Sequence, residues 1–492
     1  MLGCHDRARY VPRTTQSCDA VAIVREHLPV FLARLEGRGL SLPGFVRDEL
    51  EAFVTCGDFE QGFLVAQCQR CGDTLRVPFA CKSRGVCPSC MGRRMGETAA
   101  LLVDHRLPAC PWRQWVLSFE GPTAVRLGYD TALLKLVCQR FAHRVMQTLR
   151  AQAKREHGLT SSRDLHAGIL LVVQRFRSDL GLYVHIHALV TDGCYAREDG
   201  DAAVGAVALT DTGGPVRFWP LRGLDESHLQ RVLERLHADL AEHLDQEPAP
   251  VDDATLACLQ LALPGLPGPG LRAVADSPPA PRPMTASAFG MSLHAATCVD
   301  GRDRRQLERV CRYLLRPAFA HDAVVAMPDG QVRIHFKQPS RTGATFTQVP
   351  RDTFLARLCA LVPPPGFHMV RYYGVLAGRH ALKAAVAPRT HPSLRDPVQL
   401  PLFTVRGGLE FAALTRVESS SGPSRDPSPN RLSWARLLAR VFAIDVEQCR
   451  LCGGPMRVVR AVTDPDDIAA QLHGARAPPR PTPPGQVELF GG

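Results

Sequence analysis

Two histidines alternate on a short apolar segment that has the composition of a β-strand. His185 and His187 stand within residues 183–190, and the turn residues 191–193 follow. Side chains at positions i and i+2 of a strand point to the same face, so the two imidazoles are expected side by side. Neutral imidazole nitrogens are good ligands for divalent metals, and the pair predicts half of a metal site. The alternative is that both histidines simply line a half-buried strand.

A tyrosine stands on a basic helix further along the chain. Residues 304–316 predict an amphipathic helix that ends at Pro317. At about 100° per residue, Tyr313 lies outside the apolar face of this helix, on the side that carries the arginines. A phenol on that side could attack a phosphodiester held by guanidinium groups. The alternative is an exposed tyrosine on a solvated basic helix. The side chains expected to hold the phosphate are Arg305, Arg309, Arg312 and Arg316.

A group of cysteines near the N-terminus predicts a structural zinc site. Two Cys-x-x-Cys pairs stand there with 15 residues between them. Each pair can place two thiolates on one side of the metal, and the segment between the pairs can return as a hairpin, so that four thiolates complete one tetrahedral site. The expected ligands are Cys68, Cys71, Cys87 and Cys90, with Cys81 and His105 as further candidates.

The composition favours a protein that binds a polyanion. The chain has 492 residues, enough for two to four domains, and carries 59 Lys and Arg against 48 Asp and Glu, a net charge of +11. No apolar run is long enough to span a bilayer, and the first residues lack the apolar core of a signal peptide. We therefore expect a cytoplasmic protein without membrane association, in which the 17 cysteines serve as thiols and metal ligands rather than as disulfides. The sequence defines no oligomeric state.

Strands and helices alternate along the chain in a way that predicts an α+β protein. A Pro-rich stretch, about 247–285, reads as an inserted loop, and residues 389–430 read as a linker. Cys449 and Cys452 form one further Cys-x-x-Cys with no second pair near it in sequence, which makes half a zinc site at most. The predicted strands are 114–119, 168–176, 183–190, 289–295 and 368–376, with a hairpin at 330–349; the predicted helices are 21–55, 129–155, 225–246, 350–361, 378–387 and 431–445.

Seven segments in fixed order resemble the rolling-circle transposases of insertion-sequence family ninety-one, in the HUH superfamily. The chain is most similar to the transposases of common-region elements within that group. The similarity covers residues 20–390, with a weaker continuation through Cys449 and Cys452. The segments are 68–100, 113–118, 173–176, 185–189 with 192–193, 292–295, 311–317 and 371–376.

The resemblance implies an HUH-type antiparallel sheet with flanking helices as the catalytic core. A small helical, zinc-binding and DNA-binding domain is expected before it, and a linker and a small C-terminal region after it. The implied parts are an N-terminal domain at 20–110, a catalytic domain at 111–390, a flexible linker at 391–430, a C-terminal region with one Cys-x-x-Cys at 431–475 and a disordered tail at 476–492.

The resemblance also implies an activity and a role for each site residue. Tyr313 would attack one DNA strand at an element end and form a 5′-phosphotyrosine, while His185 and His187 would bind Mg²⁺ or Mn²⁺. Two histidines underfill a metal, so a third ligand is expected, either Gln174 or His294. Single-stranded or melted DNA is the expected partner, because a tyrosine on a helix needs access to one backbone.

The site departs from the founding members of the family at one position. Those members carry a second tyrosine four residues upstream of the first, where this chain has Arg309, so it is similar to a single-tyrosine version. Tyr372 and Tyr373 lie in a predicted strand and are expected to be structural. Three alternatives stay open: a zinc-dependent DNA-binding regulator, a plasmid relaxase or replication initiator with the same chemistry, and an inactive transposase.

Overall fold

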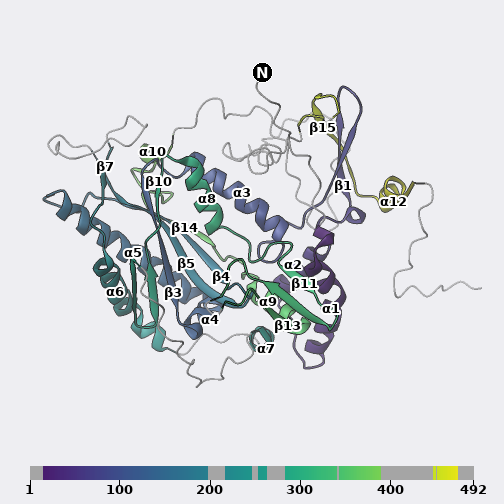
Figure 1. The fold of residues 1–492 in the computed structure, drawn as a ribbon, viewed down its shortest axis with the longest axis horizontal. Helices are drawn as coiled ribbons and strands as arrows, with labels where there is room; N and C mark the ends of the chain where they lie inside the picture. The colour runs from purple at the N-terminus through teal and green to yellow at the C-terminus, as the bar shows by residue number, and fades with distance from the viewer. Residues whose placement is uncertain are drawn as a thin grey trace, which may run out of the picture.

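Within the residues that the computed structural model describes, seven strands form a central antiparallel sheet. These residues are 15–197, 216–246, 253–262, 283–340, 343–388, 447–449 and 451–474. The strand order is β14-β4-β5-β3-β9-β8, with β10 also paired to β3 (Figure 1). The strands are β3 Pro111–Phe119, β4 Gly168–Phe176, β5 Leu182–Thr191, β8 Thr285–Ala288, β9 Met291–His294, β10 Cys298–Asp300 and β14 Val370–Gly374. The predicted α+β class with an antiparallel sheet is confirmed.

Helices cover both faces of the central sheet. The helices α4 Gly121–Tyr129, α5 Thr131–Glu156 and α6 Glu226–Asp245 pack on one face, where strand residues such as Ile186 and Val190 are buried. The helices α3 Pro88–His105 and α8 Arg304–Leu314 pack on the other face (Figure 1). Leu307, Cys311 and Leu314 form the buried side of α8, as the helical spacing predicts.

The register of the strands places four predicted site residues on one face. In an antiparallel pair, residues directly opposite each other point to the same side of the sheet. Gln174 on β4 lies opposite His185 on β5, and His187 lies opposite Val116 on β3, which in turn lies opposite His294 on β9. This is the face that α8 covers, because Val172, the partner of His187 on β4, packs against α8.

A mostly buried ion pair fixes β5 against β3. The guanidinium of Arg113 donates to both carboxylate oxygens of Asp192, at 2.9 and 2.8 Å, and to the carbonyl of Ala295 at 3.1 Å. A bidentate pair of this kind holds both geometry and register. Arg113 and Asp192 belong to the segments that resemble the transposase family, and in the structure they position the histidine strand.

The N-terminal helices share a hydrophobic core with elements that lie before and after α8 in the sequence. The helices α1 Asp19–Glu36 and α2 Gly44–Val54 pack with α7 Asp253–Ala262, α9 Arg351–Leu361 and a small antiparallel sheet. That sheet consists of β11 Val324–Ala326, β12 Gln331–His335 and β13 Phe346–Pro350. The predicted boundary between residues 110 and 111 stays a prediction.

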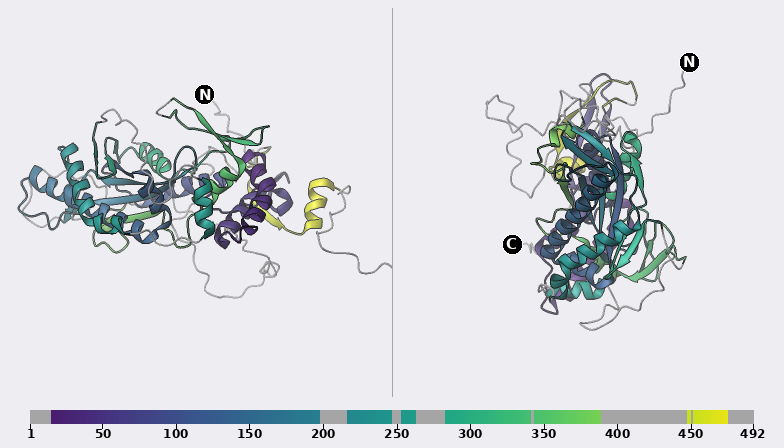
Figure 2. Two further views of the ribbon diagram at one scale, coloured as in Figure 1. Left: turned by 90° about the horizontal axis from the view of Figure 1, so that it is seen from below. Right: turned by 90° about the vertical axis from the view of Figure 1, so that its left-hand side faces the viewer.

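A further small sheet joins two distant parts of the chain. The hairpin β1 Phe63–Cys68 and β2 Thr74–Pro78 pairs through β1 with β15 Met456–Val462, and α12 Pro465–His473 follows β15. Figure 1 shows the C-terminal elements in yellow beside purple β1, and Figure 2 shows α12 next to the N-terminal helices. Phe63, Val65, Val462 and Ile468 form its small core.

Several predicted elements differ in the structure. Residues 289–295 are not one strand, because Phe289 and Gly290 adopt positive φ angles of 55° and 68° and form the turn between β8 and β9. The helix α7 lies inside the stretch 247–285 that was predicted as a loop, and the predicted helix 378–387 is reduced to α10 Lys383–Val386. The single helix predicted at 129–155 begins at Thr131, because Asp130 caps α5 and ends α4.

A two-stranded sheet consists of β6 Gly193–Arg197 and β7 Val216–Pro220, and Thr15–Ser17 and Phe59–Gln61 form short 3-10 helices. The predicted linker 391–430, helix 431–445 and tail 476–492 lie outside the described residues. No helix in the described part of the chain is long and apolar enough to cross a membrane.

Candidate active site and metal-binding residues

His185 and His187 lie next to each other on β5, as the strand periodicity predicts. Their ring centroids are 4.9 Å apart, and only 4% of His187 is exposed. Burial lowers the pKa of His185 to about 4 and that of His187 to about 3, and the nearby charge of Arg316 acts in the same direction. Both imidazoles are therefore neutral at pH 7, the form that binds a metal.

Hydrogen bonds to the Nδ1 atoms orient both rings. Nδ1 of His185 donates to the carbonyl of Tyr183 at 3.3 Å, which leaves its Nε2 lone pair free. The amide of Gln114 on β3 lies 3.0 Å from Nδ1 of His187. The atom that faces Nδ1 there is the amide nitrogen, which donates to Nδ1 and leaves the proton of His187 on Nε2. If the amide is turned over, its oxygen accepts the proton of Nδ1 instead, and Nε2 of His187 is then free for a metal, as it is in His185. Sequence reasoning missed Gln114, and only the strand register identifies it.

Gln174 connects the histidine strand to the end of α8. Its amide nitrogen donates to the carbonyls of Leu314 at 2.7 Å and Tyr313 at 3.3 Å. Its amide oxygen is buried and accepts no hydrogen bond from the part of the chain that the structure describes. An unpaired buried oxygen next to His185 fits the missing third ligand, because carbonyl-type oxygens suit Mg²⁺ and Mn²⁺.

His294 is further from the histidine pair than Gln174. It lies on the same face, but β3 separates its strand from β5, so its backbone is two strand spacings, roughly 10 Å, from that of His187. Gln174 is one spacing away, on the adjacent strand. Of the two predicted candidates for a third ligand, the geometry favours Gln174.

Tyr313 projects from α8 toward the histidines. Its ring centroid is 6.0 Å from that of His187, and 45% of the residue is exposed, so DNA can reach the phenol. Two cations lie over the ring: Cζ of Arg316 at 5.5 Å and Nζ of Lys337, just after β12, at 5.6 Å from the centroid. Lys337 was not predicted, since nothing in its local sequence relates it to Tyr313.

The four predicted phosphate-binding arginines have different surroundings. Arg316 lies over Tyr313 and also over Phe176 at 5.1 Å. Arg312 is engaged by Glu308, one turn earlier on α8, at 2.5 Å. Arg305 and Arg309 are exposed. Of the four, Arg316 is the one that lies over the ring of Tyr313 and whose charge acts on both histidines.

Tyr372 and Tyr373 lie on a strand, as predicted. Both belong to β14, where they pair with Leu170 and Ile169 of β4. The ring of Tyr372 lies under the guanidinium of Arg106 at 5.9 Å, and burial raises the pKa of both phenols, that of Tyr373 to about 12. Their surroundings are those of packed strand residues.

The predicted grouping of the cysteines is wrong. The two N-terminal Cys-x-x-Cys pairs do not meet; each belongs to a different group of four thiols. Within each group the sulfur atoms all lie within 4.8 Å of one another. The first group is Cys56, Cys81, Cys87 and Cys90, and the second is Cys68, Cys71, Cys449 and Cys452.

The β1–β2 hairpin explains why the two pairs are apart. Cys68 and Cys71 form the tip of this hairpin, whereas Cys56 and Cys81 flank its base, where the N–H of Gly57 donates to the carbonyl of Phe79 at 2.9 Å. The six residues of β1 span roughly 20 Å, too far for tip and base to share one metal. His105 is also excluded, because 15 residues of α3 place it roughly 22 Å from Cys90.

The first group has the geometry of a tetrahedral thiolate site. Its Sγ atoms are separated by 3.5 Å (Cys81–Cys90), 3.6 Å (Cys56–Cys87) and 3.7 Å (Cys56–Cys90). Four sulfurs at about 2.3 Å from a zinc ion lie about 3.8 Å apart, so these separations fit. Backbone N–H groups point at the sulfurs as well, for instance from Cys90 to Cys87 at the start of α3. Cys56 was missed because it is a single cysteine 31 residues before Cys87.

Replacing Cys56 by alanine tests the first group. We expect Cys56→Ala to bind one zinc ion fewer per chain and to lower the free energy of unfolding by on the order of 5 kcal/mol, because the metal stabilises only the folded form. Cys18→Ala is the matched control, since Cys18 is buried in the same hydrophobic core but belongs to neither group. Metal analysis and thermal unfolding measure both effects. Equal zinc contents in the two variants would contradict the assignment.

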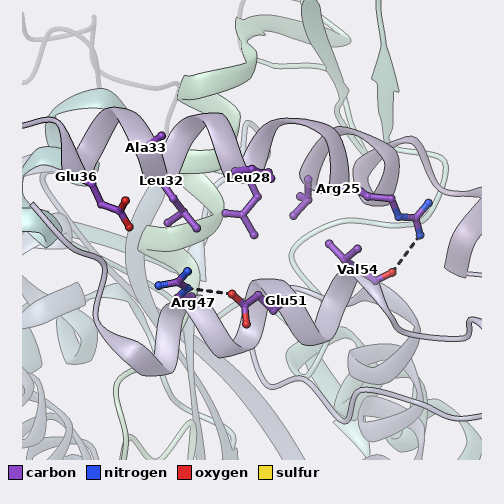
Figure 3. Close-up of a pocket in the computed structure, with 10 residues that line it drawn as sticks. Arg25, Leu28, Leu32, Ala33, Glu36, Arg47, Glu51 and Val54 are labelled. Carbon is purple, nitrogen blue, oxygen red and sulfur yellow. Dashed lines mark hydrogen bonds and ion pairs between the residues drawn. The ribbon is translucent and has the colours of Figure 1, made fainter. Parts of the chain in front are cut away.

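A groove between α1 and α2 contains none of the predicted site residues. Leu28, Leu32 and Val54 line it, and Arg47 bridges to Glu51 at 3.0 Å (Figure 3). Its lining is apolar with a charged rim and has no metal-binding group of histidines or cysteines. The groove is thus separate from both the tyrosine site and the cysteine groups.

Comparisons with known proteins match two regions of the chain to transposase families. Residues 23–119 match the family model "Transposase zinc-binding domain", and residues 168–384 match the family model "Putative transposase". The first range contains the first cysteine group, and the second contains both histidines and Tyr313. The protein "Putative transposase y4qJ" of Sinorhizobium fredii (strain NBRC 101917 / NGR234) is 26% identical over 344 residues, which cover 69% of this chain and 76% of that protein.

No solved structure matches the chain. The two family regions follow one another in the order that the sequence predicted. Over both matched regions the chain is therefore similar to the transposases of insertion-sequence family ninety-one (IS91).

Proposed function

We propose that this transposase cleaves one strand of DNA at an element end by attack of the Tyr313 hydroxyl on a phosphodiester. The observation that supports this proposal is an exposed tyrosine whose ring centroid lies 6.0 Å from that of His187 and within 5.6 Å of two cations. A bond forms between the phenolic oxygen and phosphorus, and the bond from phosphorus to the 3′-oxygen breaks. The phenol loses its proton, the leaving 3′-oxygen gains one, and the DNA stays attached as a 5′-phosphotyrosine.

His185, His187 and Gln174 are the residues that would hold a catalytic Mg²⁺ or Mn²⁺. The fit rests on two neutral imidazoles on one face and on the unpaired amide oxygen of Gln174. A divalent ion bound there supplies Lewis-acid chemistry, withdrawing charge from the phosphodiester and from the leaving oxygen. The amide nitrogen of Gln174, bonded to the carbonyls at the end of α8, fixes Tyr313 relative to the histidines.

Arg316 and Lys337 would bind the phosphate that Tyr313 attacks. Both cations lie over the phenol ring, where they can contact a phosphate that approaches the hydroxyl. The single-stranded or melted form of DNA fits this site, because an exposed side chain on a helix can approach one backbone directly. The upstream position on α8 is the exposed Arg309, so the proposal uses one tyrosine per chain for the rolling-circle reaction.

Alanine at position 316 tests the role of the cations. We expect Arg316→Ala to reduce the rate of covalent adduct formation about 100-fold, since it removes the charge nearest both the phenol and the phosphate. Arg305→Ala is the control, because Arg305 is exposed at the start of α8, 11 residues before Arg316, and its removal should change the rate less than about threefold. Rates are compared at saturating DNA, so that weaker binding does not enter. Equal effects of the two substitutions would contradict the role of Arg316.

A covalent-adduct assay tests the function as a whole. The full-length protein is incubated with Mn²⁺ or Mg²⁺ and with labelled single-stranded oligonucleotides that carry the element ends, and the products are separated on a denaturing protein gel. We expect a labelled band at the mass of protein plus DNA only when metal is present. Tight binding of the oligonucleotides without any adduct would favour a zinc-dependent DNA-binding regulator or an inactive transposase instead.

A further inference from the structure

We propose that Cys68, Cys71, Cys449 and Cys452 bind a second structural zinc ion, which joins the N-terminal hairpin to the C-terminal segment. The matched zinc-binding domain ends at residue 119, so Cys449 and Cys452 lie outside it. The proposal is independent of the cleavage chemistry, because it concerns residues remote in sequence from His185, His187 and Tyr313.

The sulfur atoms of the second group have the spacing of zinc ligands. Sγ of Cys68 lies 3.5 Å from Sγ of Cys452, and Sγ of Cys71 lies 3.5 Å from Sγ of Cys449. These separations are close to the ~3.8 Å edge of a zinc tetrathiolate and far above the ~2.05 Å of a disulfide bond. All four thiols are free. Each chain segment contributes two ligands, as in a site closed by two Cys-x-x-Cys turns.

The two turns have the same backbone hydrogen bonds. The N–H of the first cysteine in each turn donates to the carbonyl five residues later, from Cys68 to Asp73 at 2.8 Å and from Cys449 to Gly454 at 2.7 Å. In both turns, the N–H of the glycine four residues after the first cysteine donates to the carbonyl of that cysteine, from Gly72 to Cys68 at 3.1 Å and from Gly453 to Cys449 at 2.9 Å. Two segments separated by more than 370 residues thus adopt one geometry around the same four sulfurs.

Glycines allow the two turns to close on the sulfurs. Gly72 and Gly453, each directly after the second cysteine of its turn, have positive φ angles of 78° and 68°. A Cβ atom at Gly454 would lie 3.0 Å from Sγ of Cys68 and 3.2 Å from Sγ of Cys452. The N–H of Gly454 also points at Sγ of Cys452, at 3.4 Å. Such N–H groups stabilise thiolates, and those of Arg70 and Cys71 point at Sγ of Cys68 in the same way, at 3.4 and 3.5 Å.

Packing alone does not explain why these cysteines meet. Cys71 is exposed and Cys452 is half-buried, whereas cysteines that only fill a core are buried. The core beneath the three strands contains four buried side chains, and most of β15 is exposed. A module with so small a core needs a metal or another crosslink to be stable. Two hydrogen bonds complete the junction between the hairpin and the C-terminal segment. The N–H of Gln69 donates to the carbonyl of Pro455 at 2.9 Å, and the guanidinium of Arg70 donates to the carbonyl of Cys452 at 3.1 Å.

Zinc stoichiometry tests the proposal directly. The full-length protein is purified under reducing conditions, and its zinc is measured by mass spectrometry against protein concentration. We expect two zinc ions per chain in the wild type, one in Cys449→Ser/Cys452→Ser and two in Cys298→Ser, a control at an exposed cysteine outside both groups. One zinc ion per chain in the wild type, or two in the double variant, would overturn the proposal. The zinc content of the wild type tests for the second zinc ion even if the double variant is unstable.

A second measurement tests the junction itself. A protease site is introduced between residues 389 and 446, and the cleaved protein is passed over a sizing column. We expect the C-terminal fragment to stay with the rest of the chain in the wild type and to separate from it in Cys449→Ser/Cys452→Ser. Retention of the fragment in the double variant would show that strand pairing alone holds it. Neither measurement involves DNA cleavage, so a failure here is distinguishable from a failure of the tyrosine mechanism.

Discussion

Replacing Tyr313 by phenylalanine should abolish the covalent adduct with single-stranded DNA. The substitution removes only the hydroxyl oxygen that forms the bond to phosphorus, and losing a nucleophile of this kind lowers a rate by about 10⁴-fold or more. The fold should not change, because 45% of Tyr313 is exposed and its ring contacts His187, Arg316 and Lys337 through its face and edge. The denaturing gel assay measures the adduct, and thermal unfolding verifies that the variant is folded.

Tyr372→Phe is the matched control for this experiment. Tyr372 lies in the same domain but belongs to β14 and is partly buried under Arg106, so its phenol is not accessible in the same way. We expect Tyr372→Phe to form the adduct at close to the wild-type rate. An adduct that persists in Tyr313→Phe and disappears in Tyr372→Phe would move the nucleophile to β14 and refute the proposed role of α8.

Alanine at both His185 and His187 should remove the metal dependence of cleavage together with most of its rate. Without the imidazoles only Gln174 of the proposed ligands remains, and the loss of charge stabilisation at phosphorus should reduce the rate by about 10³-fold. The binding of DNA should change little, because Arg316 and Lys337 remain in place. Adduct formation as a function of Mn²⁺ concentration, together with a DNA-binding titration, separates the two effects.

His294→Ala is the comparison for the histidine variant. His294 lies on the same face of the sheet, but β3 separates it from His187, so its removal should leave the Mn²⁺ dependence close to that of the wild type. A loss in His294→Ala as large as in the double variant would make His294 the third ligand in place of Gln174. Unchanged cleavage in the double variant would mean that the two histidines are structural.

Local sequence is sufficient to predict the relative positions of residues that lie on the same strand or helix. The two-residue period of a strand places His185 beside His187, and the helical period places Tyr313 off the apolar side of α8. Gln174 could be suggested because its strand and the histidine strand form a hairpin, whose register follows from the turn. In each case the decisive distance is fixed within one or two neighbouring elements.

The other site residues depend on contacts between distant parts of the chain. Lys337 reaches Tyr313 from the strand region after β12, and Gln114 reaches His187 through the pairing of β3 with β5. Periodicity contains no information about either contact. The cysteines show the same limit, since the spacing of the two N-terminal pairs fits one zinc ion, but the hairpin between them holds the pairs apart.

One sequence signal could have corrected the grouping of the cysteines. The turn at Cys68 and the turn at Cys449 share the pattern Cys-x-x-Cys-Gly, whereas the pair at Cys87 begins a helix and has a proline after its first cysteine. Turns of the same pattern tend to form the two halves of one site. The separation of 384 residues between Cys68 and Cys452 made this pairing invisible to an argument based on proximity in sequence.

The pairing of β1 with β15 also has a consequence for how the protein is made. At about 5–20 residues per second, a ribosome needs roughly 20–80 s to proceed from Cys68 to Cys452, a distance of 384 residues. During that interval the edge of β1 that later receives β15 is open, and two thiols at the hairpin tip await their partners. The nascent chain must therefore keep an unpaired strand edge from aggregating while the whole central sheet is synthesised, and any product that ends before residue 449 keeps that edge permanently.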